Sequence, residues 1–307
     1  PTAVSPEAGP GCRFLFGMRP FVVNWGRPGC GKRAQPHEKS ARHPGIRKAE
    51  FRMEILFLGT GAFDYQPGLE GQYRDKFDCD CRRSSSVLVD GRLMIDCGDY
   101  ALNSLAIAGV KKKEIADLLI THTHRDHCRP DLIEKLAAAV PGGLNVWCHE
   151  SAAAFFPKSA HYAVHSLRCG EPEQIGGFSV SALYANHRTE RTEERPVHYV
   201  LEKGGKKIFY GCDGAWFLTP TFYALMHAGF SLTVGDYDGD FRICEHNSIP
   251  MVRKLIVSMK PLGVFADNCK IYISHLAPSL HAPHRETSRK LAAEGILVAH
   301  DGLVETV

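Results

Sequence analysis

The chain has 307 residues, of which 44% are hydrophobic and 23% are charged, and this composition is typical of a soluble globular protein. No apolar run approaches the roughly 20 residues that a bilayer-spanning helix needs, so the sequence excludes a helical membrane protein. The eleven cysteines follow no regular spacing, and an odd number cannot pair completely within one chain. We therefore expect reduced thiols and a cytoplasmic protein.

The net charge of +3 conceals a difference between the two parts of the chain. Residues 1–52 contain ten Lys and Arg against three Glu, a net charge of +7, which leaves −4 for residues 53–307. The first segment is rich in Pro, Gly and Arg and has no periodicity, which predicts a disordered basic extension. Its Gly26–Lys32 stretch has P-loop spacing, but Arg33 stands where Ser or Thr would bind Mg²⁺. A mitochondrial transit peptide is one alternative, and non-native sequence before Met53 is the one we favour.

The elements up to residue 120 are predicted from short apolar runs and the turns between them. A strand over 53–61 runs into a Gly-Thr-Gly turn, and a long polar loop over 62–85 follows. A hairpin over 85–96 is predicted next, because an Asp-Gly pair separates two apolar runs. One or two short helices over 100–113 then lead into a buried strand over 116–120.

The second half alternates apolar runs with polar loops and an occasional helical pattern. The apolar spacing over 130–140 predicts a helix face, and a second amphipathic helix is predicted to end at Met259. Further strands are predicted at 144–148, 174–183, 197–201, 206–211, 231–236 and 269–274.

The segment that follows the strand over 116–120 carries three imidazoles and one carboxylate within six residues. Neutral imidazole and carboxylate are ligands that Zn²⁺, Mn²⁺ and Fe accept. His122 and His124 can face one side of an extended backbone, while Asp126 and His127 can face a neighbouring position. The loop can therefore serve two metal ions a few ångströms apart, which is the geometry of many hydrolases.

The His-x-His-x-Asp-His pattern at 122–127 resembles the signature of the metallo-β-lactamase superfamily, and the opening strand with its Gly-Thr-Gly turn resembles it too. The resemblance implies an α/β fold over residues 53–307, in which two mixed β-sheets flanked by helices form an αββα sandwich. It also implies a metal site at one edge, with further ligands at the ends of later strands.

Three later residues match the ligand positions of the family. His187 and His275 each follow a predicted strand, whereas His198, the competitor of His187, lies inside a strand pattern that suits packing. Asp213 follows another strand and matches the bridging aspartate. The implied sites are His122, His124 and His187 for one metal, and Asp126, His127 and His275 for the second, with Asp213 bridging. Asp96 is expected to orient a ligating histidine, and His281 and His284 are expected to be loop residues.

The resemblance implies two divalent ions, Zn²⁺ or Mn²⁺, and a metal-bridging hydroxide that attacks the substrate. Asp126 and His246 are the expected catalytic residues, since His246 resembles the histidine with which phosphodiesterase branches protonate the leaving oxygen. The loop over 62–85, Arg82–Ser86, Asp96 and the Asn-His pair ending at His187 resemble the phosphodiesterase branch that serves the carbon–phosphorus lyase pathway. That branch has a cysteine-rich structural zinc site, but here only Cys79 and Cys81 are present in the equivalent loop.

These features favour a phosphodiesterase for small or cyclic phosphodiesters, and three alternatives stay open. A thioester or lactone hydrolase would share the ligands without needing an acid for the leaving group. An RNA 3′-end endonuclease would share both the metal ligands and the acid for the leaving group. The acidic body and the lack of a Gly-rich basic arm disfavour a nucleic-acid partner. A metal-binding or interaction module on the same scaffold is disfavoured by the complete ligand set. The sequence predicts a small-molecule partner and no membrane, and it leaves a homodimer, the substrate and the metal undecided.

Overall fold

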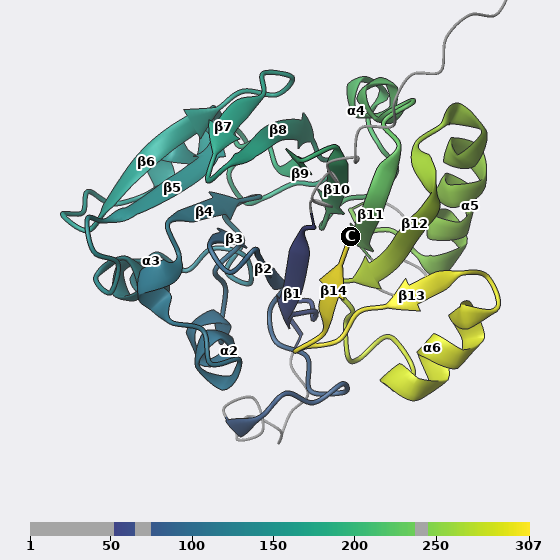
Figure 1. Ribbon diagram of the computed structural model, residues 1–307, viewed down its shortest axis with the longest axis horizontal. Coiled ribbons are helices and arrows are strands. Elements are labelled where there is room, and N and C mark those ends of the chain that lie inside the picture. Colours follow the sequence, from purple (N-terminus) through teal and green to yellow (C-terminus); the bar gives the residue numbers. More distant parts are fainter. Residues whose placement is uncertain (1–51, 65–74, 237–244) are drawn as a thin grey trace, which may run out of the picture. The chain divides into compact units, whose positions relative to one another are not determined.

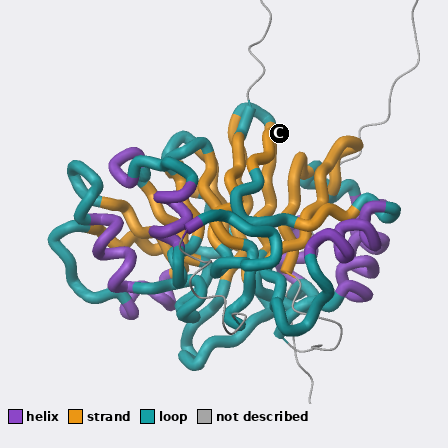
Figure 2. The backbone as a smooth tube through the Cα atoms, turned by 90° about the horizontal axis from the view of Figure 1, so that it is seen from below, coloured by secondary structure: helices purple, strands orange, loops and turns teal. Residues whose placement is uncertain are grey.

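The computed structural model describes residues 52–64, 75–236 and 245–307. The extension predicted over 1–52 lies outside this part of the chain except for Arg52, and it stays a prediction. In the described part, two seven-stranded sheets pack face to face, with helices on the outer face of each (Figure 1). Figure 2 shows the same arrangement from below, with helices to either side of the strands.

The two sheets have the same plan, because in each of them three antiparallel pairings are followed by three parallel ones. The first sheet runs β14 (Val304–Thr306), β1 (Glu54–Gly59), β2 (Ser86–Val89), β3 (Leu93–Ile95), β4 (Asp117–Ile120), β5 (Leu144–His149) and β6 (Tyr162–Leu167). The second runs β7 (Glu173–Ile175), β8 (Phe178–Tyr184), β9 (Val197–Lys203), β10 (Lys206–Gly211), β11 (Phe230–Asp236), β12 (Phe265–Ser274) and β13 (Ile296–Val298).

Helices cover the outer face of each sheet. The first sheet packs against α2 (Ala101–Ile107) and α3 (Pro130–Ala137), and the second against α4 (Thr219–Leu225), α5 (Ile249–Met259) and α6 (His284–Ala292). Short 3-10 turns lie at Lys112–Glu114, Glu150–Phe155 and Lys260–Leu262. The start of α3 follows from its sequence, because Pro130 suits the first helical position and Asp131 complements the positive helix terminus.

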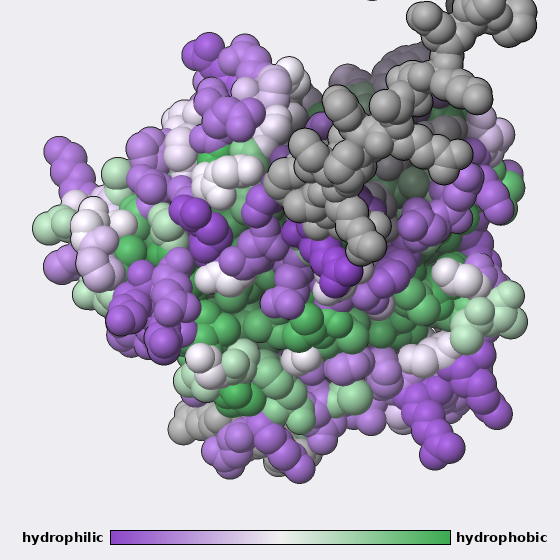
Figure 3. Space-filling view, viewed as in Figure 1, coloured by the Kyte–Doolittle hydropathy of each residue, from purple (hydrophilic) through white to green (hydrophobic). Residues whose placement is uncertain are grey.

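The central core lies between the sheets, where inward-facing residues of both interdigitate. Phe57 and Ile95 of the first sheet belong to the same buried cluster as Phe178, Tyr199 and Val234 of the second. Outside the core, the face seen in Figure 3 is largely polar, apart from a hydrophobic band over the region where β1, β14 and β13 lie in Figure 1.

Most predicted elements are confirmed, with boundaries that shift by a few residues. The Asp-Gly hairpin forms between β2 and β3, and both turn residues have the positive φ that a tight two-residue turn needs, 47° at Asp90 and 67° at Gly91. The run over 174–183 is two strands, since Gly176 and Gly177 reverse the chain between β7 and β8. The strand β6, the helix α4 and the elements after β12 had no sequence prediction.

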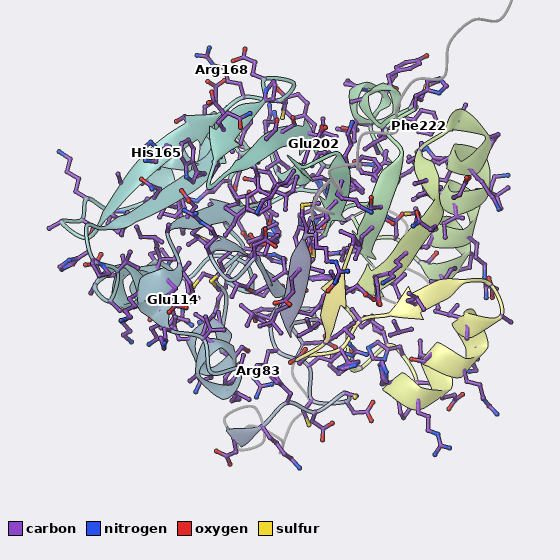
Figure 4. The ribbon with its side chains drawn as sticks, viewed as in Figure 1. Arg83, Glu114, His165, Arg168, Glu202 and Phe222 are labelled. Carbon is purple, nitrogen blue, oxygen red and sulfur yellow. The ribbon has the colours of Figure 1, made fainter. Side chains whose placement is uncertain are left out.

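The polar loop that was expected over 62–85 is described at 62–64 and 75–85, and its last residues are buried. The guanidinium groups of Arg82 and Arg83 are almost fully excluded from solvent (Arg83 is labelled in Figure 4). Arg83 forms an ion pair with Asp301 at 3.3 Å, and Arg82 donates to Thr60 Oγ1 at 2.6 Å. These contacts fasten the loop to β1 and to the C-terminal segment.

None of the described helices combines the length and the apolar character that a membrane crossing requires.

Candidate metal centre

The predicted ligand residues come together at the ends of strands. His122, His124, Asp126 and His127 follow β4, while His187 follows β8, Asp213 follows β10 and His275 follows β12. Their potential ligand atoms form two groups, and within each group all of these atoms lie within 4.8 Å of one another. Both groups contain Asp213.

The first group, cluster 1, consists of His122, His124, His187 and Asp213. Nδ1 of His124 lies 3.0 Å from Nε2 of His122 and 3.1 Å from Nε2 of His187. Oδ2 of Asp213 lies 3.6 Å from His122 Nε2 and 3.7 Å from His187 Nε2. Three imidazole nitrogens thus converge with one carboxylate oxygen on a common point.

The second group, cluster 2, consists of Asp126, His127, His275 and Asp213, all of them buried. Oδ1 of Asp213 lies 3.0 Å from His275 Nε2 and 3.2 Å from His127 Nε2. Oδ2 of Asp126 lies 3.4 Å from both of these nitrogens. Asp213 therefore directs one oxygen to each cluster, which is the arrangement that a bridging carboxylate requires.

The backbone around these residues is unusual. Asp96, Asp213 and His275 have φ values of 61°, 47° and 55°, in the left-handed region that non-glycine residues rarely occupy. Residues held in this way are often found at functional sites, where the surrounding structure compensates for the strain. Gly98 has a different role, because a Cβ there would lie 1.8 Å from the carbonyl oxygen of Asp126. Only glycine lets the segment after β3 approach the ligand loop so closely.

Hydrogen bonds link Asp96 to one histidine of each cluster. Its Oδ2 accepts a hydrogen bond from His127 Nδ1 at 2.8 Å, and its carboxylate also accepts from the backbone N–H and the hydroxyl of Thr121. Because that hydroxyl donates to Asp96, its oxygen is left to accept from Nδ1 of His122, which lies 3.0 Å away. Asp96 thus contacts His127, one of the predicted ligands, and through Thr121 it reaches His122, which is the position that the predicted orienting role requires.

The electrostatics of the buried groups fit a cation. Burial, together with the neighbouring imidazoles, holds the pKa of His122 well below its ordinary value, so this ring is neutral. Burial alone would also lower the pKa of His127, but the carboxylates of Asp213, Asp126 and Asp96 raise it well above the ordinary value. Burial alone would raise the pKa of Asp213, but His127 and His275 hold it well below its usual range. Without a metal, the carboxylates therefore draw a proton to His127, at the place where a divalent cation would stand.

The donor atoms also fit a metal. Nδ1 of His187 donates to the carbonyl oxygen of Glu245 at 3.1 Å, and Nδ1 of His127 donates to Asp96, so Nε2 of each ring keeps its lone pair for a metal. Within the described ranges, the buried Nε2 of His127 makes no hydrogen bond. Imidazole with carboxylate oxygen is a donor set that suits Zn²⁺ and Mn²⁺.

His246 lies beside the clusters, as predicted. Its ring stacks on that of His275 with centroids 5.3 Å apart and planes 9° apart, and it meets the ring of His187 edge to face at 4.9 Å. The next residue, Asn247, donates from Nδ2 to the carbonyl oxygen of Gly214 at 2.7 Å. This bond fastens the segment that carries His246 to the turn that carries Asp213.

A cleft of about 390 Å³ opens over the clusters. Asp126, Asp213, His246 and His275 line its inner wall, and the exposed ring of Phe63 contributes to its outer part. A volume of this size suits a small molecule.

The other histidines and cysteines lie elsewhere. His198 is buried and packs edge to face against Phe209 and Phe217, as its strand pattern predicted. His281 lies in a loop, as expected, whereas His284 is the first residue of α6. In the described part of the chain, the groups that could hold a metal are clusters 1 and 2, and neither includes Cys79 or Cys81.

Two site residues had no signal in the sequence. Glu194 belongs to the charged stretch Thr-Glu-Glu-Arg, which resembles an exposed loop, yet its side chain is buried and contacts Thr123. Asn247 could have been suspected only because it follows His246. Thr121 belongs to the ligand motif, so its position was visible, but its bond to Asp96 was not.

One sequence-family model and several solved structures are similar to this chain. The sequence-family model described as "Anti-Pycsar protein Apyc1" matches residues 83–137, which include β2, β3, β4 and the ligand loop. No curated protein matches the sequence.

Several solved structures have a similar fold. A diphosphatase of the PhnP family superposes with a TM-score of 0.66 at 22% identity, over 84% of this chain and 98% of that one. The metallo-β-lactamase fold protein YhfI from Bacillus subtilis superposes with a TM-score of 0.63 at 15% identity, over 83% of this chain and 99% of that one. The short form of human tRNase Z superposes with a TM-score of 0.55 at 16% identity, over 82% of this chain and 98% of that one. The chain therefore has the metallo-β-lactamase fold, and the predicted αββα sandwich of two mixed sheets is confirmed.

Proposed function

We propose that this protein is a dinuclear-metal-dependent hydrolase, and specifically a phosphodiesterase that acts on small or cyclic phosphodiesters. The observation that carries the proposal is the position of Asp213, whose two oxygens face two separate groups of buried imidazoles. One carboxylate shared between two such groups suits two cations held close together.

Cluster 1 would hold one ion through His122, His124 and His187, and cluster 2 the other through Asp126, His127 and His275. Two bound divalent cations such as Zn²⁺ or Mn²⁺ supply Lewis acidity and make water acidic enough to act as a nucleophile near neutral pH. Asp126 and Asp213 contribute hard oxygen ligands, and Asp96 keeps His127 in the tautomer whose Nε2 can bind a metal.

His246 is the proposed general acid. A phosphodiester releases an alkoxide, which is a poor leaving group unless it receives a proton. The imidazole of His246 lies at the wall of the cleft, next to His275, where it can protonate the leaving oxygen. A cleft of about 390 Å³ is of a size that holds a small molecule, which supports a small diester as the substrate.

The relatives of known structure support chemistry at phosphorus. One of them is a diphosphatase of the PhnP family and another is a tRNase Z, and both of these names denote cleavage of a phosphorus–oxygen bond. A thioester or lactone hydrolase is the first alternative, and it would need no acid at the position of His246. An RNA 3′-end endonuclease is the second, and the net charge of −4 over residues 53–307 disfavours it.

The test uses the full chain loaded with Zn²⁺ or Mn²⁺ and bis(p-nitrophenyl) phosphate as substrate. We expect turnover that is lost in an Asp126→Ala variant, because that substitution removes a ligand of cluster 2. A thioester, a lactone and a precursor tRNA should be assayed with the same preparation. Two bound metals without diester hydrolysis would refute the phosphodiesterase, and cleavage of one of the other three substrates would identify the alternative.

A further inference from the structure

The loop between β8 and β9 contains a buried carboxylate that contacts the metal-ligand loop. This residue is Glu194, which is only 5% exposed to solvent. Its Oε1 accepts the backbone N–H of Thr123 at 2.8 Å, and its Oε2 accepts the hydroxyl of Thr123 at 2.5 Å. Oε2 also accepts the hydroxyl of Thr189 at 2.8 Å.

These contacts join the two segments that carry the histidines of cluster 1. Thr123 stands between His122 and His124, and Thr189 follows His187 by two residues. Glu194 thus binds one residue from each segment through a single carboxylate. The histidines of cluster 2 lie elsewhere, at the end of the ligand loop and after β12.

The burial of the Glu194 carboxylate has to be compensated by its partners. A buried carboxylate is costly unless hydrogen bonds or an opposite charge compensate for its desolvation. Three hydrogen bonds compensate here, and no Lys or Arg side chain within the described ranges forms an ion pair with it. A cation held by His122 and His124, one residue to either side of Thr123, would add a favourable positive charge near this carboxylate.

We propose that Glu194 is a positioning residue for cluster 1, which sets the distance between the His122–His124 pair and His187 and so determines the metal affinity of that cluster alone. The inference rests on the proposed metal centre and adds a residue that touches neither metal nor substrate.

The test measures Zn²⁺ affinity at one cluster at a time, by calorimetric titration of the metal-free full chain. In a His275→Ala background cluster 2 is impaired, so the remaining site is cluster 1. In a His187→Ala background the remaining site is cluster 2. Adding Glu194→Ala should weaken Zn²⁺ binding about 10- to 100-fold in the first background, the usual effect of losing a residue that orients ligands, and leave it unchanged in the second.

Two further variants serve as controls. Glu194→Gln should restore most of the affinity at cluster 1, because an amide oxygen still accepts the N–H of Thr123 and the hydroxyls can reorient. Glu193→Ala removes the same charge from the neighbouring exposed residue and should have no effect. Should Glu194→Ala fail to fold, Thr189→Val removes one of the three hydrogen bonds and is expected to weaken cluster 1 by a smaller factor.

The outcomes separate the two proposals. Equal losses of affinity at both clusters, or no loss at cluster 1, would overturn the role of Glu194 and leave the metal centre standing. An unmutated chain that binds no Zn²⁺ would overturn the metal centre and the role of Glu194 together.

Discussion

Nδ1 of His127 donates a hydrogen bond of 2.8 Å to Oδ2 of Asp96, and both side chains are completely buried. With the proton on Nδ1, the lone pair of Nε2 faces Asp126 and Asp213. The carboxylate behind the imidazole therefore determines which nitrogen is available to a metal.

The first prediction concerns this bond. In an Asp96→Asn variant the amide oxygen can still accept from Thr121, but the amide N–H₂ group faces His127 and favours the tautomer with its proton on Nε2. We expect the metal affinity of cluster 2 to fall about 10- to 100-fold, as measured by competition with a chromophoric chelator. Asp99→Asn, in the same segment but paired with Arg125 and Arg129, is the matched control. Equal affinity in the two variants would contradict the role of Asp96.

The second prediction concerns His246. A His246→Gln variant should hydrolyse diesters with a p-nitrophenolate leaving group almost as well as the unmutated chain, because that group leaves without a proton. With alkoxide leaving groups we expect a loss of about 10²- to 10⁴-fold, the usual contribution of a general acid.

The measurement is kcat across a series of diesters with leaving groups of increasing basicity. His165→Gln is a suitable control, since His165 (labelled in Figure 4) lies on β6 and stacks on Trp147. A uniform loss across the series, or undiminished activity with every leaving group, would show that His246 does not act as an acid.

The third prediction concerns stability. Asp301 accepts hydrogen bonds from Thr60 and from the backbone of Arg83, and it pairs with the Arg83 guanidinium in the interior. Removing one partner of a buried ion pair leaves an uncompensated charge, so Asp301→Ala should lower the free energy of unfolding by about 3–5 kcal/mol. Urea denaturation measures the change. Glu294→Ala breaks an ion pair with Arg253 that is partly exposed, and it should change the free energy of unfolding far less than Asp301→Ala does.

The fourth prediction concerns pH. Burial and the neighbouring Arg82 guanidinium lower the pKa of His284 to about 4. Because the unfolded chain binds this proton near pH 6.5 and the folded chain only near pH 4, stability from this group is present above pH 6.5 and is lost as the pH falls through this window. A His284→Gln variant lacks this titration. The difference in unfolding free energy between the unmutated chain and the variant should therefore shrink from pH 7 to pH 4, and a constant difference would refute the assignment.

The ligand loop and the fold could be predicted because their signals are local. His122, His124, Asp126 and His127 lie within six residues, and short apolar runs that end in polar residues marked the strands after which His187, Asp213 and His275 follow. The edge strand β6 was missed because its sequence, Tyr-Ala-Val-His-Ser-Leu, is partly exposed and has only a weak apolar pattern.

What could not be predicted depends on contacts between distant residues. Glu193 is exposed and Glu194 is buried, and the reason is Thr123, which lies 71 positions from Glu194. Likewise Arg83 looks like a loop residue until it meets Asp301, 218 positions along the chain. Charged residues take their roles from such partners, and periodicity carries no information about them.

The left-handed backbone conformation of Asp213 and His275 costs folding stability at two residues that are predicted metal ligands. An L-residue in this conformation costs about 1–2 kcal/mol relative to the right-handed one, and glycine is free of that penalty. Glycine would relieve this cost but would also remove a carboxylate or an imidazole from a buried network in which Asp213 pairs with His127 and His275. A descendant of this chain could therefore lose the backbone strain only by giving up the site.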